Sequence, residues 1–296
     1  MVTRGLLDLM IARLPVLSYA EKTTLCETFE EETDLINSSK TDIEAIVKRN
    51  LVKFWDAEKI RRMAEHDEKA AGMRGISWVT WNSPSYPPLL REIYDPPVLL
   101  FYRGRLPDPQ SPLVAMVGTR KPSPQAAAQA FDIGKGLASG GIPVVSGLAI
   151  GIDAMSHRGN IEGGAPTVAV LGSAVDEVYP SANRALARRV LETGGILLSE
   201  YPPGTGPRKW TFPARNRIIS GMSRGVLIVE APQKSGALIT AGFALEHNRE
   251  LWVASSGVSQ AGKFIDRRGT MKLAEDGAGV INNASDILGA WNINTA

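Results

Sequence analysis

Short apolar runs recur along the last two thirds of the chain, and segments of helical character separate them. The runs cover residues 113–118, 142–147, 167–172, 196–200, 226–231 and 251–255. Helices are expected over about 125–139, 153–162 and 183–193. Runs of Val, Ile and Leu without polar alternation are typical of strands buried on both faces, and hence of a parallel sheet covered by helices. With right-handed crossovers, this pattern predicts an α/β fold with an open, doubly wound, mainly parallel, Rossmann-like sheet.

The first 75 residues have a different pattern, that of short helices. Ser18 with Glu21, and Thr41 with Glu44, both fit the capping box, in which side chains and backbone N–H groups pair reciprocally at a helix start. No residue in this part suggests chemistry, so its expected role is packing or contact with another protein.

Two domains are therefore expected. A small all-helical domain covers residues 1–75, and the α/β domain covers residues 76–296, entered through a proline-rich passage. The helical part carries 12 Lys/Arg against 14 Asp/Glu, whereas the α/β part carries 21 against 17. The positive charge therefore lies in the α/β domain.

Composition excludes several classes of protein. No 18 consecutive apolar residues occur, so no membrane-spanning helix is expected, and the N-terminus does not resemble a secretory signal. Cys26 is the only cysteine, and His66, His157 and His247 are far apart in the sequence, so no disulfide and no metal site are expected. The nucleotide fingerprints GxGxxG and GxxxxGK[ST] are absent, which weighs against NAD and ATP. We expect a cytoplasmic protein without a cofactor.

Glycines and small polar residues stand where several predicted strands end. The segments are VGTR (117–120), SGLAIGID (146–153), LGSAVDEVYP (171–180), SEYPPG (199–204) and EAPQKSGALIT (230–240). Ligands of open α/β sheets bind at the carboxyl ends of the strands, where helix N-termini also present free N–H groups. The second segment contributes Ser146 and Gly147 as candidates, and the last contributes Ser235 and Gly236.

Gly118, Thr119 and Arg120 form a candidate phosphate cradle of two exposed amides, a hydroxyl and a guanidinium. In the alternative, Gly118 serves only the turn and Arg120 pairs with a carboxylate such as Asp153. Asp153 itself is expected to cap the N-terminus of the following helix, with His157 packed beside it.

A long stretch between Glu200 and Glu230 contains no carboxylate. Its basic residues are Arg208, Lys209, Arg215, Arg217 and Arg224. This charge pattern suits a polyanion, although an ordinary solvated basic face has the same composition.

Aromatic residues interleave with these cations. Trp210 and Phe212 lie among them, and aromatic faces that stack on bases beside cations that follow phosphates are typical of single-strand binding. Both rings could instead belong to the core. Because Phe212 precedes Pro213, we expect it on a loop rather than in a helix. Asn216 could hydrogen-bond a base or the neighbouring backbone.

The order of the motifs resembles the DprA family of bacterial DNA-processing proteins, also called Smf. The motifs are MVGTR, VVSGLAIGIDAMSH, TVAVLGSAVDEVYP, LLSEYPPG, FPARNRIISGMS and VLIVEAPQKSGALITAGFALE. The resemblance implies an extended Rossmann-like domain that binds single-stranded DNA without cutting it and forms a homodimer. It further implies that the protein helps load the RecA recombinase onto incoming DNA in natural transformation, displacing single-strand-binding protein. Residues 1–75 resemble the sterile-alpha-motif-like or helix-hairpin-like domain that often precedes this core.

The resemblance assigns a phosphate-binding turn, a small-residue loop, a DNA-contacting lysine, a stacking phenylalanine and an RNR segment to this sequence. Together with the last strand-end loop, the expected nucleic-acid-binding residues are Gly118, Thr119, Arg120, Ser146, Gly147, Lys209, Phe212, Arg215, Asn216, Arg217, Ser235 and Gly236. Whether Arg215 and Arg217 touch DNA or brace their loop stays open.

The sequence departs from the family pattern in two places. Many relatives carry a winged-helix domain after the core, and none is expected here because the chain ends at Ala296. Ser256-Gly257 stands where relatives usually have proline-glycine. Nearby, Arg267 or Arg268 is expected to extend the DNA track or to lie at a dimer surface.

Two functions fit these observations to different degrees. The first is a non-catalytic, DNA-binding recombination mediator. The second is an enzyme such as a nucleotide N-glycoside hydrolase, which would need a carboxylate beside the phosphate site. Residues 231–245 contain no acid, so Glu200 and Glu230, which end predicted strands, are the candidates for that chemistry.

Overall fold

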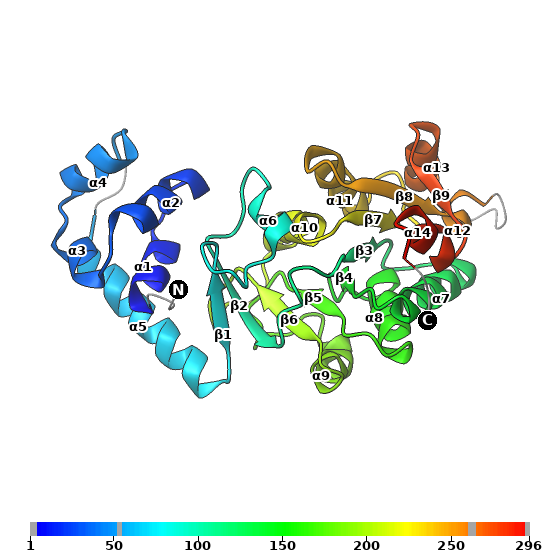
Figure 1. Ribbon diagram of the computed structural model, residues 1–296, viewed down its shortest axis with the longest axis horizontal. Coiled ribbons are helices and arrows are strands. Elements are labelled where there is room, and N and C mark those ends of the chain that lie inside the picture. Colours follow the sequence, from blue (N-terminus) through cyan, green and yellow to red (C-terminus); the bar gives the residue numbers. More distant parts are fainter. Residues whose placement is uncertain (1–4, 52–54, 260–264, 294–296) are drawn as a thin grey trace.

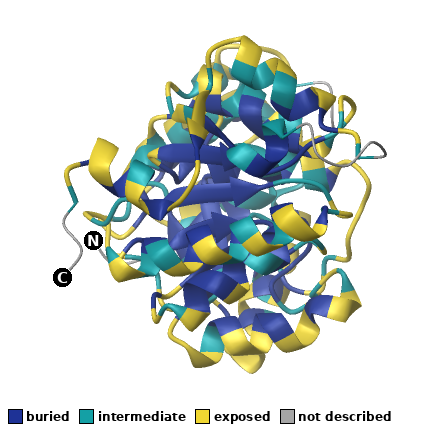
Figure 2. Ribbon diagram, turned by 90° about the vertical axis from the view of Figure 1, so that its right-hand side faces the viewer, coloured by how far each residue is buried: buried dark blue, intermediate teal, exposed yellow. Residues whose placement is uncertain are grey.

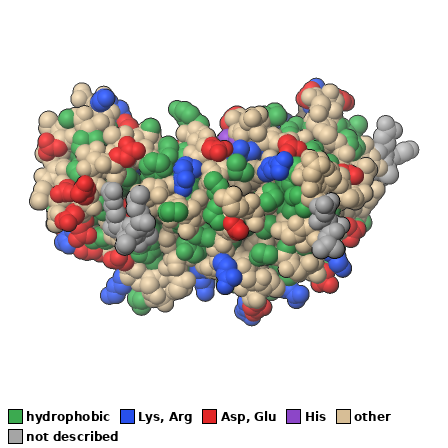
Figure 3. Space-filling model, in the orientation of Figure 1, with side chains coloured by type: hydrophobic (Ala, Val, Ile, Leu, Met, Phe, Trp, Pro, Cys, Tyr) green, Lys and Arg blue, Asp and Glu red, His purple; other side chains and the backbone are tan. Residues whose placement is uncertain are grey.

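The computed structural model describes residues 5–51, 55–259 and 265–293. Within these residues, five helices precede the first strand (Figure 1). They are α1 (Leu6–Arg13), α2 (Tyr19–Thr28), α3 (Glu32–Asn37), α4 (Lys40–Val47) and α5 (Ala57–Met73). Apolar side chains at helical spacing bury one side of these helices, with Leu7, Leu25, Leu35 and Ile43 at the centre. Several carboxylates lie over this helical part, at the left of Figure 3.

The rest of the described chain is built on a nine-stranded sheet in the order β1-β2-β6-β5-β4-β3-β7-β8-β9. The strands are β1 (Ser77–Thr80), β2 (Leu99–Gly104), β3 (Val114–Val117), β4 (Val144–Ser146), β5 (Val168–Val170), β6 (Ile196–Ser199), β7 (Gly225–Ile228), β8 (Glu250–Ala254) and β9 (Gly279–Ile281). Along this order, every neighbouring pair from β6 through to β9 is parallel. At the other end, β1 pairs antiparallel with β2, and β2 pairs antiparallel with β6. The predicted α/β fold with a mainly parallel, doubly wound sheet is confirmed.

Helices cover both faces of this sheet. Their bounds are α6 (Pro88–Arg91), α7 (Pro124–Ser139), α8 (Ile152–Glu162), a 3₁₀ turn (Ser181–Asn183), α9 (Arg184–Glu192), α10 (Thr211–Gly221), α11 (Gly236–Glu246), α12 (Ser255–Val258), α13 (Arg268–Glu275) and α14 (Ala284–Ala290). Residues of α6, α10, α11 and α13 share one apolar cluster with the sheet, and residues of α7 and α14 share another. Neighbouring residues of β3 alternate between the two, with Ala115 in the first and Val114 in the second. Figure 2 accordingly shows buried strands between helices whose outer sides are exposed.

All six apolar runs form strands, β3 to β8, and the three expected helices are α7, α8 and α9. The sequence patterns did not predict β1, β2 or β9. The first two flank the proline-rich passage, where short apolar stretches give no clear period, and β9 has only three residues.

The capping motifs have mixed outcomes. Ser18 and Glu21 form the predicted capping box at the start of α2. The prediction for Thr41 and Glu44 is wrong, because α4 begins two residues earlier on a box formed by Ser39 and Asp42. Glu44 instead accepts the backbone N–H of Leu51 at 2.6 Å, beyond the end of its own helix.

Apolar contacts join the helical part to the sheet. Buried side chains of α1 to α5 belong to one cluster with Leu99 and Phe101 of β2. The rings of Tyr19 and Trp81 also meet nearly at right angles, at a centroid distance of 6.0 Å. Arg74, just after α5, forms an ion pair with Asp176 from the loop after β5. Across the described ranges, no helix is long and apolar enough to cross a membrane.

Candidate nucleic-acid interface

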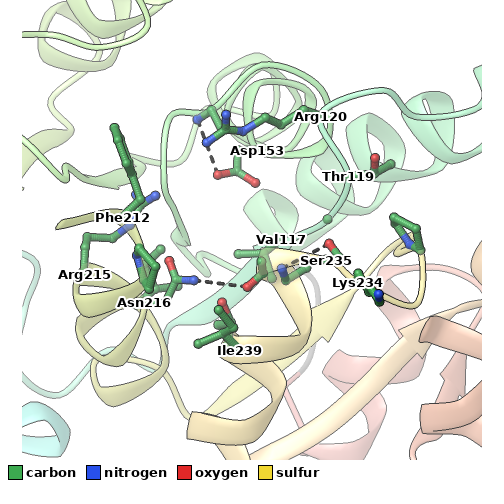
Figure 4. Close-up of a pocket in the computed structure, with 18 of the residues that line it drawn as sticks. Val117, Thr119, Arg120, Asp153, Phe212, Arg215, Asn216, Lys234, Ser235 and Ile239 are labelled. Atoms are coloured by element: carbon green, nitrogen blue, oxygen red, sulfur yellow. Dashed lines mark hydrogen bonds between the residues drawn. The ribbon is translucent and has the colours of Figure 1, made fainter. Parts of the chain in front are cut away.

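A cavity opens where the strand order reverses, at the carboxyl ends of the neighbouring strands β3 and β7. Its volume is about 570 Å³, and its walls are the turn after β3, the first half of α10 and the loop that leads into α11 (Figure 4). The lining includes nine of the twelve residues expected from the sequence: Gly118, Thr119, Arg120, Lys209, Phe212, Arg215, Asn216, Ser235 and Gly236. Their contact with nucleic acid stays a prediction.

The turn after β3 is held tightly by its neighbours. A Cβ on Gly118 would collide with the side chain of Ile152 and the carbonyl of Glu230, so this close approach requires glycine. The Thr119 N–H donates to the Glu230 carbonyl at 2.8 Å, and the Thr119 carbonyl accepts the N–H of Ile152 at 3.2 Å. The expectation of two exposed amides is therefore wrong at Thr119. Its hydroxyl accepts the N–H of Lys121 at 3.2 Å and can still donate its own proton.

Arg120 and Phe212 come together at the cavity. The guanidinium carbon of Arg120 lies 5.9 Å from the centroid of the Phe212 ring, within the range of a cation–π contact. In the part of the chain that the structure describes, no carboxylate forms an ion pair with Arg120, so the alternative pairing with Asp153 is wrong. The guanidinium is exposed and remains available to an anionic ligand.

Phe212 lies in the first turn of α10, so its expected place on a loop is wrong. Pro213 is tolerated there because first-turn N–H groups have no partner within the helix. The Phe212 ring packs against Gly172 and lies 5.4 Å from the ring of Tyr179, centroid to centroid. Trp210 is 59% exposed and is not a core residue.

The rest of the lining contains exposed cations and two polar residues that cap or link helices. Lys209 and Lys234 are exposed residues of the cavity lining. The Asn216 amide donates to the carbonyl of Gly236 at 3.2 Å and so links α10 to α11. The Ser235 hydroxyl accepts the N–H of Ala237 at 3.2 Å and caps α11.

Arg215 forms the floor of the cavity and is only 6% exposed. Its guanidinium donates to the carbonyl of Val170 at the end of β5 and occupies the space where a Cβ on Gly147 would stand. Burial lowers the pKa of Arg215 to about 10, against the attraction of Asp153, so the charge persists at neutral pH. Arg215 thus braces the walls of the cavity.

Asp153 is buried behind this floor. Its carboxylate accepts the N–H groups of Gly147 at 3.1 Å and Ala149 at 3.4 Å. The N-cap of α8 is Gly151, so Asp153 does not cap that helix as expected but fixes the loop before it. Burial raises the pKa of Asp153, and the positive charge of Arg215 opposes that rise.

Ser146, Gly147 and Arg217 do not line the cavity. The Ser146 hydroxyl is buried and donates to the carbonyl of Met116 at 2.6 Å. Arg217 donates to Glu200 at 2.7 Å and lies 3.4 Å from the carboxylate of Asp95. Arg217, like Arg215, is committed to internal contacts.

Glu230 is also engaged in internal contacts and is only 1% exposed. It accepts hydrogen bonds from the N–H of Ser123 at 2.9 Å, from the Ser123 hydroxyl at 2.7 Å and from Arg267 at 3.1 Å. Because Arg267 is only 4% exposed, it does not extend a DNA track or lie at a dimer surface, and that expectation stays a prediction for Arg268 alone. Arg268 is exposed and paired with Asp266 at 2.9 Å.

Eleven lining residues lie outside the predicted set, among them Lys234, Tyr179 and Ile239. Lys234 and Tyr179 stand within strand-end segments that the sequence had already marked, so a cation or an aromatic side chain in such a segment was the available signal. Ile239 lies in the first turn of α11, and an apolar residue in a helix carries no comparable signal.

A family model described as DNA recombination-mediator protein A matches residues 77–292, which include every residue of the cavity. The chain belongs to this family. The resemblance of the motifs to DprA and Smf is thereby confirmed, and the core that contains the cavity is the family's core.

Individual relatives agree with this assignment. Protein Smf of Synechocystis is 40% identical over 230 residues, which are 76% of this chain and 55% of that protein. The chain thus spans little more than half the length of that relative. The crystal structure of DprA from Streptococcus pneumoniae superposes with a TM-score of 0.77 at 31% identity and covers 97% of this chain and 98% of its own. DprA from Helicobacter pylori, whose structure concerns its single-stranded DNA binding mode, gives 0.62 at 28% identity and covers 73% of this chain and 95% of its own.

Proposed function

We propose that the chain is a single-stranded DNA-binding recombination mediator without catalytic activity. In this proposal, it protects incoming DNA in the cytoplasm and helps load the RecA recombinase onto it during natural transformation. It acts as a homodimer and displaces single-strand-binding protein. The supporting observation is the meeting of Arg120 and Phe212 across a cavity whose other exposed charges are Lys209 and Lys234.

This arrangement has the chemistry of a strand-binding site. Three exposed cations can contact successive phosphates while Phe212 offers a ring to a base, a combination that tolerates any base sequence. The structure of the Helicobacter pylori relative concerns its single-stranded DNA binding mode, which supports the same choice of ligand.

The positions of the acids support a role without catalysis. A hydrolase acting on a nucleotide needs a carboxylate in reach of the reacting bond. Glu200 is paired with Arg217, and Glu230 is buried with Arg267 and Ser123. Asp153 belongs to the cavity lining, but it is only 6% exposed and two backbone N–H groups donate to its carboxylate.

The proposal is tested by the salt dependence of oligo-dT binding, measured by fluorescence anisotropy at several salt concentrations. Each phosphate contact on a single strand contributes about 0.7 to the slope of log K against log salt. We expect Arg120→Ala and Lys209→Ala each to weaken binding and to reduce that slope by about 0.7. The matched control is Lys135→Ala, which removes the same charge from an exposed position of α7 outside the cavity. Parent-like affinity and slope in both cavity variants would show that the strand binds elsewhere.

The mediator step is tested with RecA on single-stranded DNA already coated with single-strand-binding protein. We expect the chain to shorten the lag before RecA hydrolyses ATP, and Phe212→Ala to lose most of this effect. An undiminished effect in Phe212→Ala would separate RecA loading from the cavity. Incubation with nucleotides should release no free base, and release of base would restore the hydrolase alternative.

A further inference from the structure

Trp210 is an aromatic side chain displayed to solvent beside the cavity. It is 59% exposed, whereas Trp252 and Trp291 are buried and the other three tryptophans are partly buried. Trp210 does not line the cavity. Its only ring neighbour is Tyr201, among the residues described, at a centroid distance of 5.9 Å and an interplanar angle of 79°. The two rings are thus nearly perpendicular, and more than half of the Trp210 surface stays exposed to solvent.

The loop that carries these two rings is fixed. The backbone N–H of Gly204 donates to both carboxylate oxygens of Asp176, at 3.1 and 3.2 Å. The N–H of Ala174 donates to the carbonyl of Thr205 at 2.8 Å. Asp176 is also paired with Arg74. A ring that is held in place before its ligand arrives loses little freedom on binding, which favours stacking.

The surroundings of Trp210 match those of a polyanion track. Arg208 and Lys209 immediately precede it, both are exposed, and Lys209 also lines the cavity. No carboxylate occurs from Tyr201 to Val229. Trp210 and Phe212 are two residues apart, so their Cα atoms are separated by at most about 7 Å. At roughly 3.4 Å per base along a stacked strand, this equals about two nucleotides.

We propose that Trp210, supported by Tyr201, is a second stacking site for the same DNA strand, about two nucleotides beyond the base at Phe212. Lys209, which is exposed and precedes Trp210 in the chain, is then available to a phosphate of the same strand. This inference rests on the proposed function and extends the binding site out of the cavity onto the loop between β6 and α10. An exposed indole could alternatively contact another protein, including a second copy of this chain, and the experiment includes that outcome.

The test compares parent, Trp210→Ala and Phe212→Ala in binding oligo-dT of two to twelve nucleotides. An oligonucleotide that fills only the cavity cannot reach Trp210, so the parent and Trp210→Ala should bind the shortest ones equally. For longer ones, Trp210→Ala should bind roughly 5- to 150-fold more weakly, the range expected for one stacked base. Phe212→Ala should lose affinity at every length.

Two further variants make the result specific. Trp210→Phe keeps a stacking face and should recover most of the lost affinity. Tyr94→Ala removes an aromatic side chain that is 98% exposed and lies outside the cavity, and should bind all lengths as the parent does. Because stacking releases few counterions, the salt slope of Trp210→Ala should equal that of the parent, whereas Lys209→Ala should reduce it.

Three outcomes would overturn the inference. The first is equal binding of long oligonucleotides by Trp210→Ala and the parent while Phe212→Ala is impaired, which leaves the proposed function intact. The second is that Trp210→Ala loses as much affinity for the shortest oligonucleotides as for the long ones, which would place Trp210 at the cavity itself. The third is a change of oligomeric state in light scattering without a change in DNA affinity. Full affinity of Phe212→Ala at all lengths would instead contradict the proposed function.

Discussion

At the scale of single residues, the basic side chains of the 208–217 segment divide by what they already contact. Lys209 and Arg208 are exposed, whereas Arg215 is bound to the Val170 carbonyl and Arg217 to Glu200. All four read alike in the sequence, because charge and spacing do not reveal which guanidinium has an internal acceptor. The sequence could therefore locate the basic segment but could not separate bracing arginines from available ones.

This division predicts very different losses of stability for two arginine substitutions. Arg215→Ala leaves the Val170 carbonyl without its donor and Asp153 without a nearby positive charge, which should lower the free energy of unfolding by about 2–4 kcal/mol. Arg120→Ala removes an exposed side chain and should change it by less than about 0.5 kcal/mol. Urea unfolding of both variants measures the difference, and equal stabilities would contradict the bracing role.

Gly147 provides a second test at this scale. A methyl group there would enter the space of the Arg215 guanidinium, so Gly147→Ala should destabilise the protein by about 1–3 kcal/mol. Combining Gly147→Ala with Arg215→Ala should cost less than the sum of the two changes, because the collision disappears with the side chain. Additive losses in a double-mutant cycle would show that the two positions are independent.

At the scale of elements, two predictions were wrong because the sequence did not show where a helix begins. The sequence pattern Ser/Thr-x-x-acid occurs at both Ser39 and Thr41, and only the position of the first helical turn tells which pair caps α4. Likewise, Pro213 was read as excluding Phe212 from a helix, although proline is accepted in a first turn. Strands β3 to β8 were predicted well because burial on both faces leaves an unbroken apolar run.

The two capping motifs give a matched pair of variants. Ser18→Ala removes the side chain that accepts the Glu21 N–H and should destabilise the protein by about 1 kcal/mol. Thr41→Ala changes the other predicted capping motif. Because Thr41 lies within α4 and caps no helix, this change should leave the free energy of unfolding almost unaltered. Thermal unfolding should therefore separate the two variants, and a similar shift for both would argue against the observed start of α4.

At the scale of the whole molecule, the reversal of strand order brings distant segments to one place. The turn after β3 precedes the N-terminal half of α10 and the loop after β7 by more than ninety residues, yet the three segments enclose one cavity. The sequence marked the turn after β3 and the loop after β7 because each follows an apolar run, and it marked α10 by its cations and aromatic rings. It could not show that Ser146 would turn inward to the Met116 carbonyl, since that depends on how tightly β3 and β4 pair.

Acid should destabilise the whole fold through buried His157. Burial, and next the charge of Arg215, lower its pKa to about 3, so His157 stays neutral in the folded protein. An unfolded chain takes up that proton below about pH 6.5, so stability is full above this pH and falls as the pH decreases towards 3. We expect a loss of about 2 kcal/mol between pH 7 and pH 5.

The measurement is urea unfolding across this range, compared with His157→Gln. The variant lacks the titrating imidazole, so its stability should depend less on pH between 5 and 6.5, whatever its stability at pH 7. Two carboxyl groups with shifted pKa values titrate below the range compared. The folded-state pKa values of Glu21 and Asp266 are about 2, and in the unfolded chain these groups take up protons only below about pH 4.5. An unchanged pH dependence in His157→Gln would assign the acid sensitivity to other groups.

The Arg215 brace also has a kinetic consequence. With β5, α8 and α10 already tied together around the guanidinium, the walls need no rearrangement before a strand enters. Association should then be a single bimolecular step whose observed rate rises linearly with DNA concentration, without a concentration-independent phase. Its rate constant should fall steeply with added salt, as in electrostatically steered encounters, while the rate of release changes little.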